Sequence, residues 1–283
     1  MPKTWLITGC STGFGELFVR QLRSLGENVI AAGRNSETKL SHLKDTGASI
    51  MDLDVTAPED EIESKMAYAW NIYPNGIDVV VNNAGYILYG TFEELRQKHL
   101  EDVFKTNFHG PLNITRALLP KLRAKGNGTL LYMGSQAGWH ADATATGYCA
   151  SKHALEGAVE CLSLELALFA PDIKVLIVEP GYFRTKAFYN ISYAIPGTSE
   201  VAQFHATVQE GVKAQLGKEP GNPEKAVGIM IDLVRGTGIA AGKKVPLRVP
   251  LGSDGWARIR YKCETVMNIC DDWEQVAKST DFE

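Results

Sequence analysis

Short apolar runs alternate with longer segments of helical periodicity from the first residues onward, and this alternation limits the folds that the chain can adopt. The apolar runs predict strands at 5–7, 29–32, 49–52, 77–81, 129–133, 175–178 and 245–249, and the periodic segments predict helices at 13–25, 58–73, 100–123, 148–170 and 223–235. Residues 77–81 are almost wholly apolar, as expected of a strand that is covered on both faces. Strands that alternate with helices in this way predict an α/β fold with a doubly wound parallel sheet and helices on both faces.

Two segments depart from the alternation. Residues 182–222 are rich in aromatic and turn-forming residues and are too long for an ordinary connection, which predicts a lid over a binding site. Residues 253–283 are expected to form a C-terminal helical tail, from about Gly255 to Lys278. The chain shows no linker and no repeat, and its 283 residues suffice for one large core, so a single domain over 1–283 is predicted.

Composition excludes several classes of function. The net charge is -4 with both signs interspersed, which is unlike a nucleic-acid-binding surface. No apolar run approaches the roughly 18 residues of a membrane span, and the N-terminus lacks the apolar region of a signal peptide. The five cysteines have neither metal-site nor disulfide spacing. We therefore expect no metal, no membrane span and a reducing, cytoplasmic location.

A glycine-rich turn lies between the first predicted strand and the first predicted helix. Gly9, Gly13 and Gly15 permit a tight turn and a close approach of the backbone to a pyrophosphate, which the helix N-terminus would also favour. The end of the second predicted strand indicates which cofactor binds. This strand ends at Gly33 and Arg34. An acidic residue there would bind the ribose 2′-hydroxyl of NAD, whereas arginine suits the 2′-phosphate of NADP, so NADP(H) is the predicted cofactor.

Tyr148 and Lys152 stand four residues apart in a predicted helix and therefore share one face. A neighbouring ammonium lowers a tyrosine pKa from its usual value of ~10, which makes the pair a candidate acid/base unit. Tyr182 and Lys186 repeat the spacing, but they follow Pro180-Gly181 in a loop. A serine, Ser135, stands thirteen residues before Tyr148. The serine upstream and the helical position therefore favour Tyr148 and Lys152 as the acid/base pair.

Taken together, the motifs resemble those of the short-chain dehydrogenase/reductase family over essentially the whole chain. The matching residues are Thr8-Gly9-x-x-x-Gly13-x-Gly15, Asp54-Val55, Asn82-Asn83-Ala84-Gly85, Asn107, Ser135, Tyr148-x-x-x-Lys152 and Pro180-Gly181-x-x-x-Thr185. The resemblance implies a Rossmann-type fold. The run Arg248–Asp254 is similar to the single-domain, steroid-dehydrogenase-like branch.

The resemblance also implies residue roles. Tyr148 would give a proton to the substrate oxygen that Ser135 holds, Lys152 would lower the Tyr148 pKa and bind the nicotinamide ribose, and Asn107 would support a water that relays a proton. Asp54 would accept a hydrogen bond from adenine. The implied cofactor site comprises Gly9, Ser11, Thr12, Gly13, Phe14, Gly15, Arg34, Asp54, Asn83, Ala84, Gly85, Tyr148, Lys152, Pro180, Gly181, Phe183 and Thr185.

These residues predict an NADPH-dependent oxidoreductase that reduces the carbonyl of a bulky hydrophobic substrate. The residues expected to wall its pocket are Tyr86, Ile87, Trp139, His140, Phe183, Phe188, Tyr189 and Tyr193. The aromatic lid suits a polyketide, steroid, terpenoid, quinone or alkaloid of secondary metabolism. Two alternatives remain: action on an imine or epimerisation at the same site, and a non-catalytic NADP-binding regulatory protein. By resemblance, a homodimer or homotetramer would form through the long helices that hold Asn107 and Tyr148.

Overall fold

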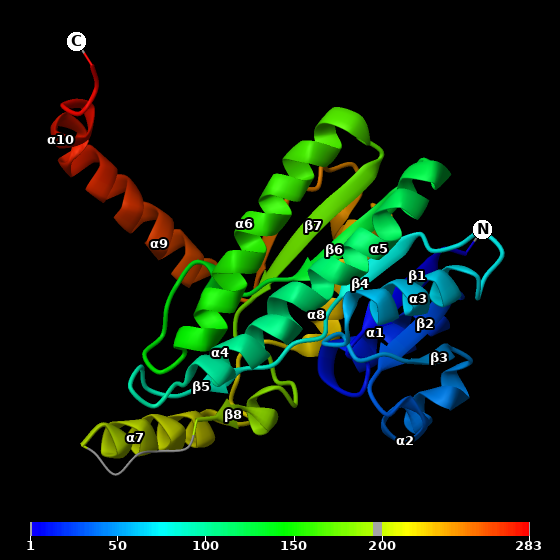
Figure 1. Cartoon of the computed structure of the whole chain (residues 1–283), viewed down its shortest axis with the longest axis horizontal. Helices are drawn as coiled ribbons and strands as arrows, with labels where there is room; N and C mark the ends of the chain where they lie inside the picture. Colours follow the sequence, from blue (N-terminus) through cyan, green and yellow to red (C-terminus); the bar gives the residue numbers. More distant parts are fainter. Residues whose placement is uncertain (1, 195–199, 283) are drawn as a thin grey trace.

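The computed structural model describes residues 2–194 and 200–282 of the chain and shows a single Rossmann-type domain around a seven-stranded parallel sheet (Figure 1). The strands are β1 (Thr4–Thr8), β2 (Asn28–Gly33), β3 (Ser49–Asp52), β4 (Val79–Asn82), β6 (Gly128–Met133), β7 (Ile173–Pro180) and β9 (Arg248–Leu251). Their order is β3-β2-β1-β4-β6-β7-β9. The order reverses between β1 and β4, and in such sheets the ligand crevice lies outside the carboxyl ends of the strands at this point.

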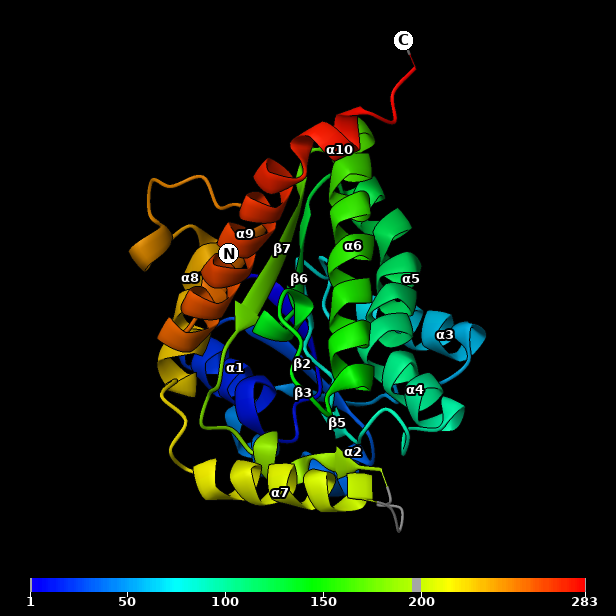
Figure 2. The ribbon, with the colours of Figure 1, turned by 90° about the vertical axis from the view of Figure 1, so that its left-hand side faces the viewer.

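Helices cover both faces of the sheet (Figure 2). On one face lie α1 (Gly13–Ser24) and α8 (Pro223–Arg235), and on the other lie α3 (Glu59–Trp70), α5 (Gly110–Lys125) and α6 (Thr146–Phe169). Strand β4 shows why the sheet needs both layers. Val79 and Val81 pack into the core beneath α1 and α8, whereas Val80 packs into the core beneath α3, α5 and α6. The doubly wound fold is therefore confirmed.

The helix predicted over 100–123 is divided in the structure. Helix α4 (Gln97–Phe104) leads into a π-helical turn at Lys105–His109, and α5 follows it directly. Pro120 was expected to disturb the end of this helix, but α5 continues through it to Lys125. π-Helical turns inside longer helices often mark functional sites, and this turn contains Asn107.

The last strand and the C-terminal tail also differ from expectation. The strand predicted at 245–249 lies at Arg248–Leu251, where it pairs with Ile177–Pro180 of β7 at the edge of the sheet. Pro250 is tolerated there because an edge strand has one unpaired side. The tail is divided at Trp273 into α9 (Ser253–Asp272) and α10 (Glu274–Lys278).

The insertion at 182–222 contains regular structure that the sequence did not predict. Strand β8 (Ser192–Tyr193) pairs with β5 (Leu88–Tyr89) in a separate two-stranded sheet, and helix α7 (Glu200–Gln215) lies beyond it at one end of the molecule (Figure 2). Buried His205 of α7 contacts Glu94, with 2.6 Å between Nδ1 and Oε2. In the described part of the chain, no helix combines the length and the apolar character that crossing a membrane requires.

Candidate active site

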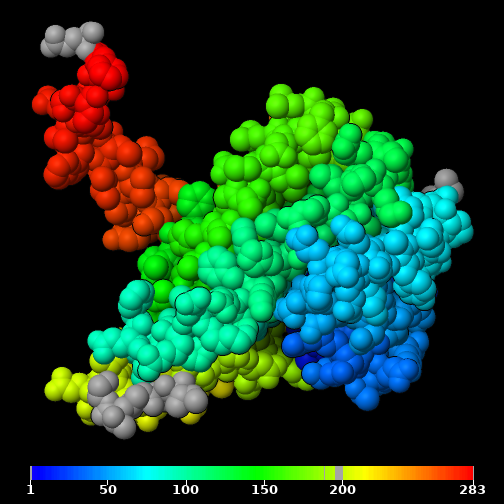
Figure 3. All heavy atoms as spheres, viewed as in Figure 1, coloured from blue at the N-terminus to red at the C-terminus, as the bar shows by residue number. Residues whose placement is uncertain are grey.

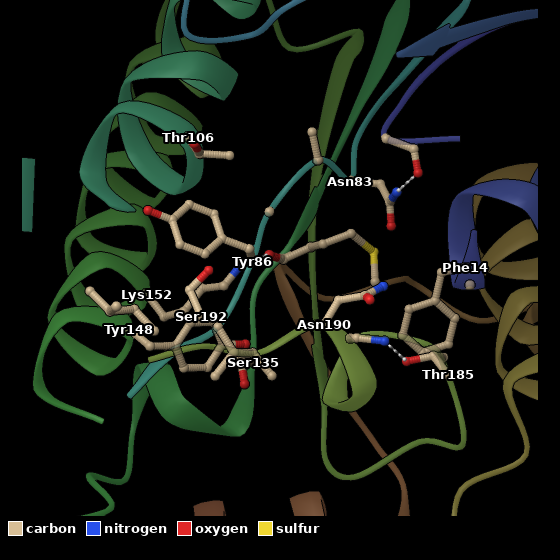
Figure 4. Close-up of a pocket in the computed structure, with 18 of the residues that line it drawn as sticks. Phe14, Asn83, Tyr86, Thr106, Ser135, Tyr148, Lys152, Thr185, Asn190 and Ser192 are labelled. Atoms are coloured by element: carbon tan, nitrogen blue, oxygen red, sulfur yellow. Dashed lines mark hydrogen bonds between the residues drawn. The ribbon is translucent and has the colours of Figure 1, made fainter. Parts of the chain in front are cut away.

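A cavity of about 1220 Å³ lies at the carboxyl ends of β1, β4, β6 and β7 (Figure 4). Most of the residues predicted to form the site line this one cavity. Those residues are Gly9, Ser11, Thr12, Gly13, Phe14, Arg34, Asp54, Asn83, Ala84, Gly85, Tyr86, Ser135, Tyr148, Lys152, Pro180, Gly181, Phe183 and Thr185. Ligand pockets for single small molecules usually enclose about 300–1,000 Å³, so the cavity has room for a dinucleotide and a second molecule.

The turn between β1 and α1 is built so that backbone rather than side chains faces the cavity. Gly9 and Gly13 adopt positive φ angles of 71° and 62°, which favour glycine. A Cβ on Gly15 would lie 2.3 Å from the Gly9 carbonyl oxygen, so no other residue fits there without a shift. Thr12, the N-cap of α1, makes no side-chain capping bond. The first N–H groups of α1 are thus free of a side-chain cap, as an anion site at a helix N-terminus requires.

Asn83 locks this turn to the neighbouring strand. Its Nδ2 donates to the carbonyl oxygens of Thr8 at 2.8 Å and Gly9 at 3.1 Å. The Thr8 hydroxyl in return accepts from the backbone N–H groups of Asn83 and Ala84, at 3.1 Å and 3.0 Å. These four bonds fix the β1 turn and the segment after β4 as one rigid floor of the cavity.

The end of the cavity near β2 and β3 carries cationic side chains. Exposed Arg34 lines it, as does Lys39 of the short helix α2 (Ser36–Lys39). The sequence pattern gave no sign that Lys39 belongs to the site. Asp54 also lines this end, and its Oδ1 accepts from the backbone N–H and the hydroxyl of Thr56 at 2.9 Å and 2.8 Å. The two cations give this end of the cavity a positive potential that suits an anionic group.

Tyr148, Ser135 and Lys152 meet at the opposite end of the cavity (Figure 4). Helix α6 presents Tyr148 and Lys152 on one face, and Ser135 follows β6. The Ser135 side chain lies beside Tyr148 (Figure 4), and its interaction with the Tyr148 hydroxyl lowers the pKa of that group. Buried Lys152 donates from Nζ to the Met133 carbonyl at 2.7 Å, and its Nζ lies 5.8 Å from the centre of the Tyr148 ring. The three polar groups therefore converge on one point of the cavity wall.

Burial controls the protonation of this group. Desolvation raises the pKa of Tyr148 to about 12, although the hydrogen bond from Ser135 opposes the rise. Burial lowers the pKa of Lys152 to about 8, which the charge of Glu156 partly counteracts. Lys152 was expected to lower the Tyr148 pKa, but burial outweighs any such effect in this structure. Near neutral pH Tyr148 is therefore a protonated acid that can donate to an oxygen.

Asn107 lies behind this group and does not line the cavity. Its side-chain amide forms a two-point clamp on the backbone of Tyr86: Nδ2 donates to the carbonyl at 3.0 Å and Oδ1 accepts from the N–H at 3.0 Å. Nδ2 also donates to the hydroxyl of Ser151, which donates to the Tyr148 carbonyl at 2.7 Å. Asn107 thus ties the segment after β4 to the first turns of α6.

Several predicted wall residues lie away from the cavity. Tyr86, Ile87, Phe183 and Tyr193 line it, whereas Trp139, His140 and Tyr189 do not, and the side chain of Phe188 falls outside what the structure describes. Trp139 turns away because its Nε1 donates to Glu179 at 2.8 Å and Arg248 stacks on its ring. His140 lies 3.6 Å from Asp142, from Nε2 to Oδ1, and Tyr189 is largely exposed.

The second Tyr-x-x-x-Lys sequence has a different setting. Tyr182 lines the cavity, but its hydroxyl lies 3.3 Å from Asp142 Oδ2 and 3.3 Å from Arg258 Nη1. Arg258, in α9, donates to both carboxylate oxygens of Asp142 at 2.9 Å and 3.0 Å. This bridge was missed because Asp142 and Arg258 stand 116 residues apart. It fixes one wall of the cavity from outside the sheet.

A second charged cluster lies under α6. Glu156 and Glu179 are both buried, and Arg248 contacts them, with Nε at 2.9 Å from Glu156 and 3.7 Å from Glu179. Desolvation raises the pKa of Glu179 to about 7. The sequence pattern offered no sign of this cluster either. Among the described residues, no group of three or more histidine, cysteine, aspartate or glutamate side chains is placed to hold a metal ion.

Comparisons with known proteins agree with this geometry. A family model described as short chain dehydrogenase matches residues 3–194. Oxidoreductase calM of Penicillium decumbens is 33% identical over 278 residues, which cover 92% of this chain and 87% of that protein. Retinol dehydrogenase 8 of Homo sapiens is 29% identical over 248 residues, covering 83% and 79%. The crystal structure of a short-chain dehydrogenase from Streptomyces avermitilis superimposes with a TM-score of 0.86 at 33% identity, covering 99% of this chain and 98% of that one.

Proposed function

The chain belongs to the short-chain dehydrogenase family and is an oxidoreductase of that type, and we propose that it uses NADPH to reduce the carbonyl group of a bulky hydrophobic compound. The observation that carries the proposal is the convergence of Ser135, Tyr148 and Lys152 at one end of a cavity whose other end holds Arg34. The glycine turn at Gly9 and Gly13 lines the same cavity, where it could hold the pyrophosphate of a dinucleotide.

The residues present fit such a cofactor. The uncapped N-terminus of α1 and the cavity-facing backbone at Gly9 and Gly13 would hold the pyrophosphate. Arg34 and Lys39 would hold the 2′-phosphate, and Lys152 would bind the nicotinamide ribose. When bound, the nicotinamide supplies the hydride for the reaction.

The chain itself supplies the proton and the binding of the substrate oxygen. A carbonyl that is reduced develops negative charge on oxygen, and the Ser135 and Tyr148 hydroxyls would donate hydrogen bonds to it. Tyr148 then gives up its proton from the phenol oxygen. The raised pKa of Tyr148 favours this direction, because the side chain is protonated at neutral pH. Lys152, with its pKa lowered to about 8, stabilises the phenolate that is left.

The substrate end of the cavity supports an apolar substrate. Its walls include Ile87, Leu88, Tyr89 and Tyr193. Retinol dehydrogenase 8, among the relatives, is named for a long apolar alcohol. The segment 182–222 contributes part of this wall, and we propose that it is the lid of the substrate site.

A panel of bulky carbonyl compounds tests the proposed activity. We expect NADPH oxidation with hydrophobic ketones or aldehydes and much slower oxidation with small polar ones, because the latter leave the apolar walls in contact with water. Cyclic imines belong in the same panel. Turnover of imines alone would contradict carbonyl reduction, and tight NADPH binding without turnover of any compound would instead indicate a regulatory protein.

The choice of cofactor gives a separate prediction. We expect Arg34→Ala to raise the KM for NADPH by about 10–100-fold, because one charge-assisted contact to the 2′-phosphate is lost, and to change the KM for NADH little. Steady-state kinetics with both cofactors measure this. Arg116→Ala is the control. Arg116 lies on α5, where it forms an exposed ion pair with Glu59 of α3, and its loss should alter neither KM. Equal effects of Arg34→Ala on both cofactors would contradict the assignment.

A further inference from the structure

Helix α9 leaves the body of the molecule with an apolar face still uncovered. Its first turns contact β9 and the turn at Gln136–Gly138, and Ile259 is buried there. Beyond this point α9 and α10 project away from the domain (Figure 1; Figure 3). Every described side chain from Val266 to Phe282 is exposed.

The apolar residues of this helix form a regular stripe. Residues spaced alternately four and three apart, which we call the C-terminal seam, are Ile259, Cys263, Val266, Cys270, Trp273 and Ala277. Met267 and Ile269 widen the stripe at its centre. Apolar residues at this spacing are the pattern by which two helices pack along their length. The seam begins on the face that packs against the domain at Ile259 and continues from there into solvent.

The projecting helix needs a partner to be stable. Helices of this length are marginal in water, and most of their stability comes from packing of an apolar face. Here Val266, Ile269 and Trp273 are 43%, 54% and 61% exposed. The β-branched residues in this stretch lower its intrinsic helix propensity further. A surface that covers the seam would therefore stabilise α9 as well as remove apolar area from water.

The charges beside the seam indicate what covers it. Asp254 and Arg258 face the domain, and the rest of the first half of α9 carries Arg260, Lys262 and Glu264, a net charge of +1. The second half with α10 carries Asp271, Asp272, Glu274 and Lys278, a net charge of -2. A second copy of the same helix in the antiparallel direction brings each basic half against an acidic half. A parallel copy would place like charges together. The net charges of the two halves therefore favour the antiparallel orientation.

We propose that two copies of this chain pair antiparallel through their C-terminal seams. The two-fold axis lies near Met267, so that Val266 packs against the second copy's Cys270 and Arg260 faces the second copy's Glu274. In the single chain Arg260 contacts Glu264 and Glu274 contacts Lys278, all on exposed surface, so pairing adds charge contacts without burying a lone ion. This surface is separate from the long helices α5 and α6.

Sedimentation velocity over a range of concentrations tests the seam. We expect Val266→Asp to raise the dissociation constant of one association step by about 100-fold, because a carboxylate then lies in the apolar centre. Asn268→Asp adds the same charge on the opposite face of α9 and should leave association unchanged. At concentrations below association, circular dichroism and the melting temperature of the domain should be the same in both variants, since Val266 is exposed in the single chain.

A charge exchange tests the orientation. Arg260→Glu and Glu274→Arg should each weaken the association step by about tenfold, because each places like charges together at both symmetric positions. The double variant should restore association to within about threefold of the wild type. Failure of the double variant to recover would overturn the antiparallel arrangement. A wild-type mass equal to that of Val266→Asp at every concentration would overturn the pairing itself. Flotation with phosphatidylcholine–phosphatidylserine vesicles tests a membrane surface as the partner. Flotation that Val266→Asp abolishes, without self-association of the wild type, would also overturn the pairing.

Discussion

Replacing Tyr148 with phenylalanine is expected to lower kcat/KM for carbonyl reduction by about 10³–10⁴-fold, near the upper end of what a general acid contributes. The substitution removes only the hydroxyl beside Ser135 and leaves the ring beside Lys152. NADPH affinity, measured by fluorescence titration, should change by less than about threefold, since Lys152 and the glycine turn remain. Single-turnover measurement of NADPH oxidation reads the effect directly.

Tyr182→Phe is the matched control for this experiment. Tyr182 lines the same cavity and also precedes a lysine by four residues, but its hydroxyl bonds to Asp142 and Arg258. We expect its loss to change KM for the substrate more than kcat, and to lower kcat/KM by at most about tenfold. Substantial activity in Tyr148→Phe, or equal losses in the two variants, would refute the proposed acid.

Replacing Gly15 with alanine is expected to destabilise the protein by about 3 kcal/mol and to weaken NADPH binding by about 100-fold. The added Cβ would lie 2.3 Å from the Gly9 carbonyl oxygen and 2.8 Å from Asn83 Nδ2. The backbone must shift, and the bonds from Asn83 that hold the turn must lengthen. Chemical denaturation and nucleotide titration measure the two effects.

Gly157→Ala is the matched control, because it is expected to stabilise the protein. Gly157 lies on the exposed face of α6, and an added Cβ meets nothing within 4 Å. Alanine is the better helix former, so we expect a gain of about 0.5–1 kcal/mol. A Gly15→Ala variant with wild-type stability and affinity would show that the turn can relax, and would remove the steric argument for this glycine.

The fold could be predicted because each strand of a parallel sheet is buried on both faces. Runs such as 77–81 and 129–133 are apolar for that reason, and helices with one apolar face separate them. The last strand begins three residues and ends two residues later than predicted, because 245–249 and 248–251 are similar in composition and only pairing with β7 selects between them. Helix α7 was missed because tertiary contacts, including that of His205 with Glu94, support it.

The candidate site was predictable only where its residues form a local pattern. The glycine turn and the pair Tyr148 and Lys152 are close in sequence, so their spacing indicates their geometry. The clamp of Asn107 on Tyr86 and the bridge from Arg258 to Asp142 join distant segments, and no local spacing reveals them. The rise in the Tyr148 pKa was also unpredictable, because it depends on how much protein surrounds the hydroxyl.

The bridge from Arg258 to Asp142 allows the wall of the cavity to change independently of the residues that would carry out the reaction. The proton-donating group stands on α6 and at the end of β6, whereas Asp142 and Tyr182 are held by Arg258 of the C-terminal helix. Substitutions along α9 could therefore reshape the wall while Ser135, Tyr148 and Lys152 stay in place. Relatives with the same chemistry could diverge in substrate range through changes in their last thirty or so residues, a route of adaptation that leaves the reaction centre intact.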